Sequence, residues 1–368
     1  MTKLDYVCYL NESGYSRAAQ DMILSLHDSG MYDIRITCVH GSPVRKSFSD
    51  KKYDLFHKMC SKEIDKKAIQ IFHCIPEKQR RFKRYDKSLS YATFETYNPP
   101  EHWVSHLNTL DAVLCPSLFN YKIFAHAGIK KPIFHIPHTI DIKEWNNSVS
   151  PLKQYDKFTF LFIGTWRKRK GYEVLLESWF KEFSSKDNVQ LIIHTDHGSF
   201  KKASSTASDI KRNMGLEKKD TAPIFIEDNV IEDDMMPSFI KSSDCFISTS
   251  FGEGFGLPGL QSMAVGVPVI TVDFGGCLDY ASTNSCTFIK HNGFVIHDCL
   301  DNIPQFKNKK WARVTVSETA KAMRYVFNNY EEVKKKSTYA CDFVANNFSY
   351  STNVKRFNDL LEIVYSGK

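Results

Sequence analysis

The residues best suited to chemistry lie in a glycine-rich turn within the run DCFISTSFGEGFGLPGLQSMAVGVPVITV, residues 244–272. An apolar strand precedes the turn, and Pro258 opens a helix after it, at a position where its missing N–H costs nothing. Backbone amides at such a helix start suit an anion such as a phosphate. Glu253 lies inside the turn, where its carboxylate would repel a phosphate. We therefore expect Glu253 to accept hydrogen bonds from neutral donors, of which sugar hydroxyls are the obvious class. We expect Phe255, Gly256 and Leu257, which come shortly after Glu253, to bind the same ligand.

Gln261 is a second polar residue that can face the same pocket. It follows Glu253 by eight residues and lies about one turn into the helix. The alternative for Glu253 is that it only caps the helix. Three glycines around a single cap are more than capping needs, so the ligand-binding interpretation is favoured.

The same turn also matches the dinucleotide-binding pattern, Gly254-x-Gly256-x-x-Gly259, with Asp273 at the end of the next strand. This alternative predicts an NAD-dependent oxidoreductase. Against it, the dinucleotide pattern normally opens a nucleotide domain, whereas this turn comes after several strand–helix units. The following helix is also short, about eight residues, and the acidic residue arrives early.

A cluster of cations precedes another predicted helix in FLFIGTWRKRKG, residues 160–171. A strand ends before Gly164, and Arg167, Arg169 and Lys170 come just before the helix start. A lysine at such a place is suited to a phosphate group, because helix-start amides and a cation attract the same anion. The alternative is a solvated charged face.

These candidates depend on an alternation of apolar strands and helical patterns along the whole chain. Strands this apolar are buried on both faces, as in a parallel sheet covered by helices. Ligands bind at the carboxyl ends of the strands in such sheets. The predicted strands are residues 6–10, 34–39, 69–74, 112–115 and 132–136, then 158–163, 189–193, 224–226, 244–249 and 267–272. Helical patterns include residues 19–26, 118–125 and 172–183.

A polar stretch without apolar periodicity, residues 137–151, divides the chain. At 368 residues the chain exceeds what one hydrophobic core usually supports, so we predict two Rossmann-like domains, residues 1–150 and 151–347. An apolar stripe in the last predicted helix must pack on one of them; it consists of Val354, Phe357, Leu361 and Val364.

The composition indicates a cytoplasmic protein without a signal peptide or a membrane-spanning run. Its ten cysteines are scattered and form no CxxC pair, which favours reduced thiols over disulfides. The net charge of +7 favours anionic ligands such as nucleotides. Nucleic-acid binding would require a larger positive charge, with aromatic residues interleaved among the basic ones. The basic run at residues 78–84 is interpreted as a solvated loop, with peripheral membrane or acceptor contact as the second interpretation.

The run FGEGFGLPGLQSMAVGVPVITV resembles the donor-site signature of glycosyltransferase family 4, the large retaining GT-B family. That signature has two glutamates separated by seven residues, a small-residue helix and a Gly-x-Pro-Val strand. The similarity extends to FLFIGTWRKRKG, to residues 95–117 and 126–141, and to the first loop, Ser13-Gly14-Tyr15. It implies a GT-B fold of two Rossmann-like domains facing a cleft, with the acceptor in the first domain and the donor in the second. The C-terminal helix, residues 348–368, would cross back to the first domain.

The resemblance also implies roles for particular residues. Glu253 would bind hydroxyls of the donor sugar near the reacting carbon, while Lys170, with Arg167 or Arg169, would neutralise the departing diphosphate. The glycine turns at Gly164 and Gly14 would lie beside the donor phosphates. His73, at the end of a first-domain strand, would lie near the sugar, although a strand-end histidine is also often structural.

Three positions depart from the family pattern. The second glutamate, expected to hold the ribose, is Gln261; the arginine often found after the strand glycine is Thr165; and the glycine of the interdomain His-Gly motif is Thr139. Gln261 can exchange hydrogen bonds but lacks the charge that strengthens them.

The chain contains no Asp-x-Asp triplet, so we expect no metal on the diphosphate and no cofactor. The resemblance thus predicts a metal-independent transferase that moves a sugar from a nucleotide-diphosphate sugar to a glycan, lipid or small-molecule hydroxyl. A catalytically silent GT-B partner subunit stays open because of Gln261, as do an epimerase or phosphorylase on the same scaffold.

Overall fold

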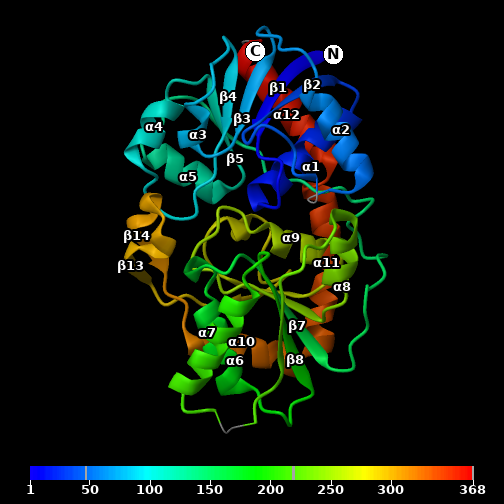
Figure 1. The fold of residues 1–368 in the computed structure, drawn as a ribbon, viewed down its shortest axis with the longest axis vertical. Coiled ribbons are helices and arrows are strands. Elements are labelled where there is room, and N and C mark those ends of the chain that lie inside the picture. Colours follow the sequence, from blue (N-terminus) through cyan, green and yellow to red (C-terminus); the bar gives the residue numbers. More distant parts are fainter. Residues whose placement is uncertain (46–47, 218–219, 367–368) are drawn as a thin grey trace. The chain divides into compact units, whose positions relative to one another are not determined.

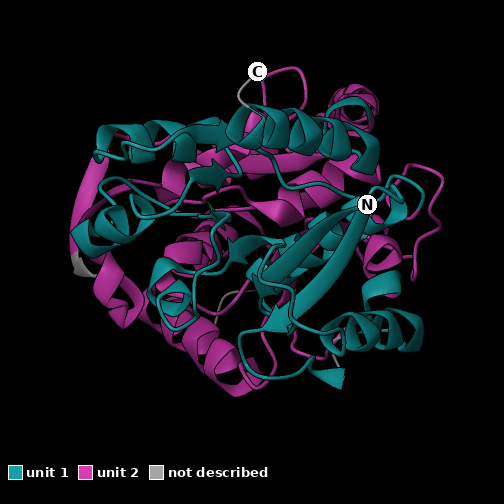
Figure 2. Ribbon diagram, turned by 90° about the horizontal axis from the view of Figure 1, so that it is seen from above, with its two compact units in different colours: residues 1–143, 232–234, 346–368 teal, residues 144–231, 235–345 magenta. Residues whose placement is uncertain are grey.

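The structure is a computed structural model that describes residues 1–45, 48–217 and 220–366, without the side chains of residues 298 and 299. The chain divides into two compact units (Figures 1 and 2). Unit 1 comprises residues 1–143, 232–234 and 346–368, and unit 2 comprises residues 144–231 and 235–345.

Unit 1 is built on a six-stranded parallel sheet in the order β2-β1-β3-β4-β5-β6. The centre of this sheet is its most deeply buried part, because every residue of β3, β4 and β5 is buried. The strand order of the sheet reverses between β1 and β3. Ligand-binding crevices form at such a reversal, at the carboxyl ends of the strands. The strands are β1 (Thr2–Cys8), β2 (Tyr32–Cys38), β3 (Ile69–His73), β4 (Ser88–Tyr91), β5 (Ala112–Cys115) and β6 (Ile133–His135).

The C-terminal helix α12 (Tyr350–Tyr365) packs in unit 1 beside α1 (Gly14–Asp28) (Figure 1). Phe357 of its apolar stripe is buried in the core formed with the first strands, and the other stripe residues pack around it. The predicted return of this helix to the first domain is therefore confirmed. The remaining helices of unit 1 are α2 (Asp50–Cys60), α3 (Pro76–Gln79), α4 (Glu101–Leu107) and α5 (Leu118–His126).

Unit 2 has a second six-stranded parallel sheet, in the order β9-β8-β7-β10-β11-β12. Counted along the unit this is 3-2-1-4-5-6, the doubly wound order, with the reversal between β7 and β10. The strands are β7 (Phe158–Ile163), β8 (Val189–His194), β9 (Ile224–Glu227), β10 (Cys245–Ile247), β11 (Val269–Val272) and β12 (Thr287–Ile289).

Helices and one appended hairpin complete unit 2. Phe160 of β7 packs against Trp179 of α6, which anchors that helix to the sheet. The helices are α6 (Tyr172–Glu182), α7 (Phe200–Asn213), α8 (Met236–Lys241), α9 (Leu257–Ala264), α10 (Val316–Asn328) and α11 (Tyr330–Asn347). An antiparallel pair that the sequence patterns did not predict, β13 (Phe294–Cys299) and β14 (Lys307–Ala312), follows the sheet.

Candidate functional site

The predicted donor residues meet at the point in unit 2 where the strand order reverses. Lys170 ends the single turn η2 (Lys168–Lys170) after β7, and Glu253 lies in the loop after β10. Because β7 and β10 are neighbours in the sheet, these loops face each other. The Lys170 Nζ donates to Glu253 Oε1 at 2.6 Å. The structure thus brings together the two residues on which the sequence interpretation depends.

The Glu253 carboxylate has unequal surroundings at its two oxygens. Oε1 accepts from Lys170 and, at 2.7 Å, from the Ser250 hydroxyl. Oε2 lies 3.3 Å from Arg169 Nη1, which donates its hydrogen bond instead to the Gly252 carbonyl at 2.7 Å. The described residues give Oε2 no hydrogen bond of good geometry, so this oxygen keeps accepting capacity.

The charge state of Glu253 follows from these contacts. Its side chain is 14% exposed, and burial alone raises the pKa of the carboxyl. The charges of Lys170 and then Arg169, with the hydrogen bonds from Lys170 and Ser250, outweigh that effect and lower the pKa to about 2. Glu253 is therefore an ionised hydrogen-bond acceptor at neutral pH.

The glycine turn packs closely against the side chain of Tyr280. Gly256 is left-handed, with φ +85°, and its carbonyl accepts from the Tyr280 hydroxyl at 2.6 Å. A Cβ on Gly256 or on Gly259 would lie 2.8 or 2.5 Å from that hydroxyl oxygen. Two of the three glycines of the dinucleotide pattern thus make room for Tyr280. The turn also follows the fourth strand of the unit, not the first, so the geometry argues against the oxidoreductase alternative.

A second loop, after β11, contacts the backbone of the glycine turn around Glu253. The sequence patterns did not predict this contact. The Gly276 amide donates to the Glu253 carbonyl at 2.8 Å, and a Cβ on Gly276 would lie 1.9 Å from the Gly254 carbonyl oxygen. Gly275 has φ +95°, and a Cβ there would lie 2.8 Å from the Glu253 carbonyl oxygen. The Gly275-Gly276 pair directly after a predicted strand is the signal that could have identified this contact.

The cationic turn after β7 is packed just as closely. Gly171 has φ +70°, and a Cβ there would lie 2.1 Å from the Thr249 carbonyl oxygen. The aliphatic part of Lys170 passes over Gly164, whose added Cβ would be in ordinary contact with it at 3.5 Å. Between the two arginines named from the sequence, Arg169 is buried against Glu253 while Arg167 is exposed.

The other predicted donor residues line the first turns of α9. Phe255 is buried with its ring centre 5.4 Å from that of Tyr280, and Leu257 is the buried first residue of the helix. Gln261 is buried one turn further on, and its side chain makes no hydrogen bond to the residues that the structure describes.

His73 lies at the carboxyl end of β3, at the corresponding reversal point of the sheet in unit 1. Its ring is buried, stacks on Tyr91 at 4.2 Å and pairs through Nδ1 with the Tyr6 hydroxyl at 2.8 Å. Nε2 is buried and has no partner within residues 1–45, 48–217 and 220–366. Burial, with a smaller effect of His138, holds the pKa of His73 well below its usual value, so the ring is neutral.

Gly14 opens α1 directly after the cap Ser13, whose hydroxyl accepts from the Ser16 amide at 3.2 Å. A Cβ on Gly14 would meet nothing within 4 Å. Packing therefore does not require glycine here, and its predicted role beside a ligand stays a prediction.

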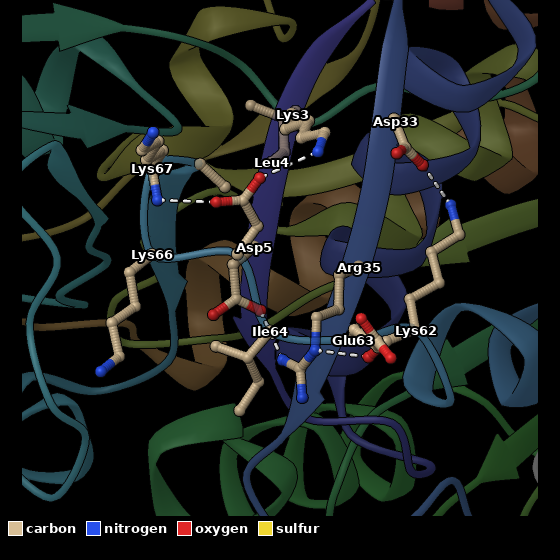
Figure 3. Close-up of a pocket in the computed structure, with 12 residues that line it drawn as sticks. Lys3, Leu4, Asp5, Asp33, Arg35, Lys62, Glu63, Ile64, Lys66 and Lys67 are labelled. Carbon is tan, nitrogen blue, oxygen red and sulfur yellow. Dashed lines mark hydrogen bonds and ion pairs between the residues drawn. The ribbon is translucent and has the colours of Figure 1, made fainter.

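A separate pocket of about 690 Å³ lies in unit 1 toward the amino-terminal ends of β1 and β2 (Figure 3). His73, at the carboxyl end of β3, is not among the residues that line it. Its floor includes Asp5, which is almost fully buried. Most of its charges neutralise one another in ion pairs, so we assign it no ligand. The pairs are Arg35–Asp5 at 2.8 Å, Lys3–Asp65 at 2.9 Å and Lys62–Asp33 at 2.5 Å.

The described part of the chain was compared with two simple structural patterns, a cluster of metal ligands and a membrane-spanning helix. No three His, Cys, Asp or Glu side chains there gather as metal ligands would. No helix among these residues combines the length and apolarity needed to cross a membrane.

Comparison with known sequences finds a family match within unit 2. Residues 157–304 match the family model described as Glycosyl transferases group 1. An uncharacterized 41.2 kDa protein in the cps region of Klebsiella pneumoniae is 25% identical over 167 residues. The aligned stretch covers 44% of this chain and 42% of that relative, so the similarity spans less than half of the relative's length.

Comparison with solved structures covers the whole chain. HepE from Anabaena, solved in complex with UDP and glucose, is 11% identical with a TM-score of 0.69, over 99% of this chain and 100% of that one. Sucrose-phosphate synthase from Thermosynechococcus elongatus is 12% identical with a TM-score of 0.68, over 100% of both chains. A glycosyltransferase from Rickettsia africae is 16% identical with a TM-score of 0.68, over 100% and 99%. At identities this low the likeness establishes the fold alone, and it confirms the predicted GT-B fold of two Rossmann-like domains.

Proposed function

We propose that this protein is a retaining glycosyltransferase of the family 4 type, which moves a sugar from a nucleotide-diphosphate sugar to a hydroxyl acceptor without a metal ion. One observation carries the proposal: an ionised Glu253 held between Lys170 and Arg169 where the strand order of unit 2 reverses. The match of residues 157–304 to Glycosyl transferases group 1 supports sugar transfer. The UDP and glucose bound by the similar HepE support a nucleotide-sugar donor.

The charges of this cluster suit a diphosphate leaving group. Lys170 and Arg169 contribute two positive charges and Glu253 one negative charge, which leaves one net positive charge in a largely buried place. A cation held in advance stabilises the negative charge that develops on the diphosphate as the sugar–phosphate bond breaks, and low solvent exposure strengthens the effect. The same charge would serve the role of a metal, which is why we propose metal independence.

Glu253 supplies the selectivity for a sugar over a phosphate. Its Oε1 is already bonded to Lys170 and Ser250, whereas Oε2 keeps accepting capacity. A donor-sugar hydroxyl that donates to Oε2 would form a charge-assisted hydrogen bond, which is worth about 1.5–3 kcal/mol. A phosphate oxygen placed there would instead be repelled.

In unit 1 we propose that His73 contacts the sugar and that the Gly14 loop approaches the donor phosphates. The neutral ring of His73 and its unpaired Nε2 support a hydrogen-bonding rather than a charge role. We also propose that the acceptor is a glycan or lipid and that the protein acts in the cytoplasm. The nine described cysteines are all free thiols, which supports a reducing compartment.

The test begins with thermal unfolding of the full chain in the presence of UDP-glucose, UDP-N-acetylglucosamine, GDP-mannose and ADP-glucose. Selective binding of one nucleotide raises the melting temperature by mass action. The selected donor is then incubated with and without EDTA, and released nucleoside diphosphate is measured by chromatography. We expect slow donor hydrolysis that EDTA leaves unchanged, and faster release when an acceptor is supplied.

Product analysis separates the alternatives. Retention predicts that proton NMR of the glycoside shows the donor's own anomeric configuration. A phosphorylase would require inorganic phosphate, and an epimerase would change the sugar without releasing nucleotide. If no donor is bound or consumed, the chain is a silent GT-B subunit, and the proposal is wrong.

A further inference from the structure

Asp301 contacts the cationic turn from a part of the sequence that carries no motif. Its Oδ1 accepts from the Lys168 amide at 2.6 Å, and its Oδ2 accepts from the Arg169 amide at 3.2 Å. Asp301 lies in the 3-10 segment η5 (Leu300–Asn302), between the two strands of the β13–β14 hairpin. One carboxylate therefore satisfies two consecutive backbone amides at the start of η2.

The backbone at Asp301 is itself in an uncommon conformation. Asp301 has φ 58° and ψ 15°, and Asn302 has φ 57°. A left-handed residue other than glycine costs on the order of 1 kcal/mol, least for Asp and Asn. Two such residues in succession persist only where surrounding contacts favour them, and the hydrogen bonds from the two η2 amides to Asp301 are contacts of this kind.

The opposite side of the turn is held by the loop that carries Glu253. The Arg169 carbonyl accepts from the Phe251 amide at 2.9 Å, and the Lys170 carbonyl accepts from the Thr249 hydroxyl at 3.1 Å. Asp301 contacts the same turn through the backbone amides of Lys168 and Arg169, so the turn is held from both sides. A single 3-10 turn with three consecutive cations has little stability of its own, because its hydrogen bonds are poor and its charges repel.

We propose that Asp301 is a positioning residue, which fixes the Lys168–Lys170 turn so that Lys170 and Arg169 converge on Glu253 and on the diphosphate of the donor. This inference rests on the proposed function for its kinetic consequence but not for its structural one. Without the carboxylate the turn would sample other orientations, and donor binding would have to select the competent one. The efficiency of donor turnover would then fall.

The test compares two substitutions of Asp301 in the full chain. Asp301→Asn keeps one acceptor oxygen and tolerance of the left-handed backbone, while Asp301→Gly removes the side chain and adopts that backbone freely. We expect kcat/KM for UDP-glucose hydrolysis, or for whichever donor the panel selects, to fall about fivefold in the first and at least tenfold in the second. If Asp301 served only to adopt the left-handed backbone, the order would be reversed, since Gly relieves the backbone strain.

The chain offers a matched control in Asp228, whose Oδ2 accepts from the amides of Gly198 and Phe200, both at 3.0 Å. Asp228 follows the edge strand β9, on the far side of the sheet from β10. Asp228→Asn should leave kcat/KM within twofold of wild type. Equal losses in Asp228→Asn and Asp301→Asn would overturn the positioning role.

A double-mutant cycle asks whether Asp301 acts through the lysine. In a Lys170→Met background, Asp301→Asn should lower kcat/KM by less than twofold, because its effect has already been lost. Undiminished additivity of the two substitutions would overturn the proposal.

Hydrogen exchange gives a readout that does not require turnover. Exchange at the Lys168 and Arg169 amides should be at least tenfold faster in both Asp301 variants than in wild type and Asp228→Asn. If wild type consumes no donor but these amides lose protection, the proposed function fails while the positioning holds. If wild type consumes donor and neither exchange nor kcat/KM changes, the positioning is refuted.

Discussion

Glu253→Gln is the substitution that examines the site most directly, since it removes one negative charge while keeping the shape of the side chain. Contacts with Lys170, Arg169 and Ser250 lower the pKa of the Glu253 carboxyl from its ordinary 4.5 to about 2. At about 1.4 kcal/mol for each pH unit, this is a stabilisation of about 3 kcal/mol from the ionised form. Because the folded pKa is the lower one, that stabilisation is complete above pH 4.5 and is lost as the pH falls toward 2.

The variant should therefore be less stable at pH 7 and also less active. We expect a melting temperature about 6–12 °C lower, at about 2–4 °C for each kcal/mol. Loss of the charged hydrogen bond to the sugar, about 1.5–3 kcal/mol, predicts turnover reduced by about 10–150-fold. Affinity for UDP alone should be unchanged or higher, because the remaining Lys170 and Arg169 carry two uncompensated positive charges.

The role of Glu253 is tested by three measurements on the same preparation of the Glu253→Gln protein. They are thermal unfolding, calorimetry with UDP, and release of nucleoside diphosphate from the selected donor. Ser250→Ala is the control, since it removes a hydrogen bond to Glu253 Oε1 and leaves the charge in place. Its turnover should stay within about threefold of wild type. A folded Glu253→Gln protein with near-normal turnover would refute the assigned role, and a parallel loss of UDP affinity would indicate that Glu253 shapes the phosphate site instead.

Further expectations concern the cations and the buried histidines. Lys170→Met keeps the aliphatic packing but removes a charged contact, so it should weaken UDP binding by about tenfold or more in calorimetry. Unchanged affinity for UDP would exclude Lys170 from the diphosphate site. Arg169→Ala should weaken UDP binding similarly, whereas the exposed Arg167→Ala should change it less than threefold, and a larger effect at Arg167 would reverse the assignment. Burial lowers the pKa of His138 to about 3 and that of His73 well below 6.5, so the unfolded chain binds protons first as the pH falls. The free energy of unfolding should therefore drop below pH 6.5 by about 1.4 kcal/mol per pH unit for each ring, and urea midpoints that do not move between pH 7.5 and 5.0 would contradict the burial.

Much of the fold follows from local patterns in the sequence. Apolar runs such as β7 (Phe158–Ile163) are buried on both faces, and their limits are set by the polar residues and glycines at each end. The predicted first strand, residues 6–10, begins later than the observed strand Thr2–Cys8, because the continuous apolar run starts only after Asp5. Asp5 is buried there because Arg35, on the adjacent strand, neutralises it at 2.8 Å.

Strand β4 (Ser88–Tyr91) had no strand-like apolar run and escaped prediction for a similar reason. Its Ser90 is fully buried although serine usually lies at the surface. The Ser90 hydroxyl accepts from the Gln79 amide at 2.8 Å, a partner that comes from a separate helix. Sequence patterns record polarity but not the partner that makes a polar residue acceptable in a core.

For the site, the sequence by itself determined the chemistry that is present: a carboxylate in a glycine turn and a row of cations before a helix. Only the tertiary structure decided which of these groups meet. Lys170 and Glu253, separated by 83 residues, come within 2.6 Å because β7 and β10 are neighbours at the reversal of the strand order. The tertiary structure likewise places Arg169, and not Arg167, against Glu253, and it brings Asp301 to the cationic turn. A side chain's direction depends on how the whole turn is held from both sides, and those contacts come from distant parts of the chain.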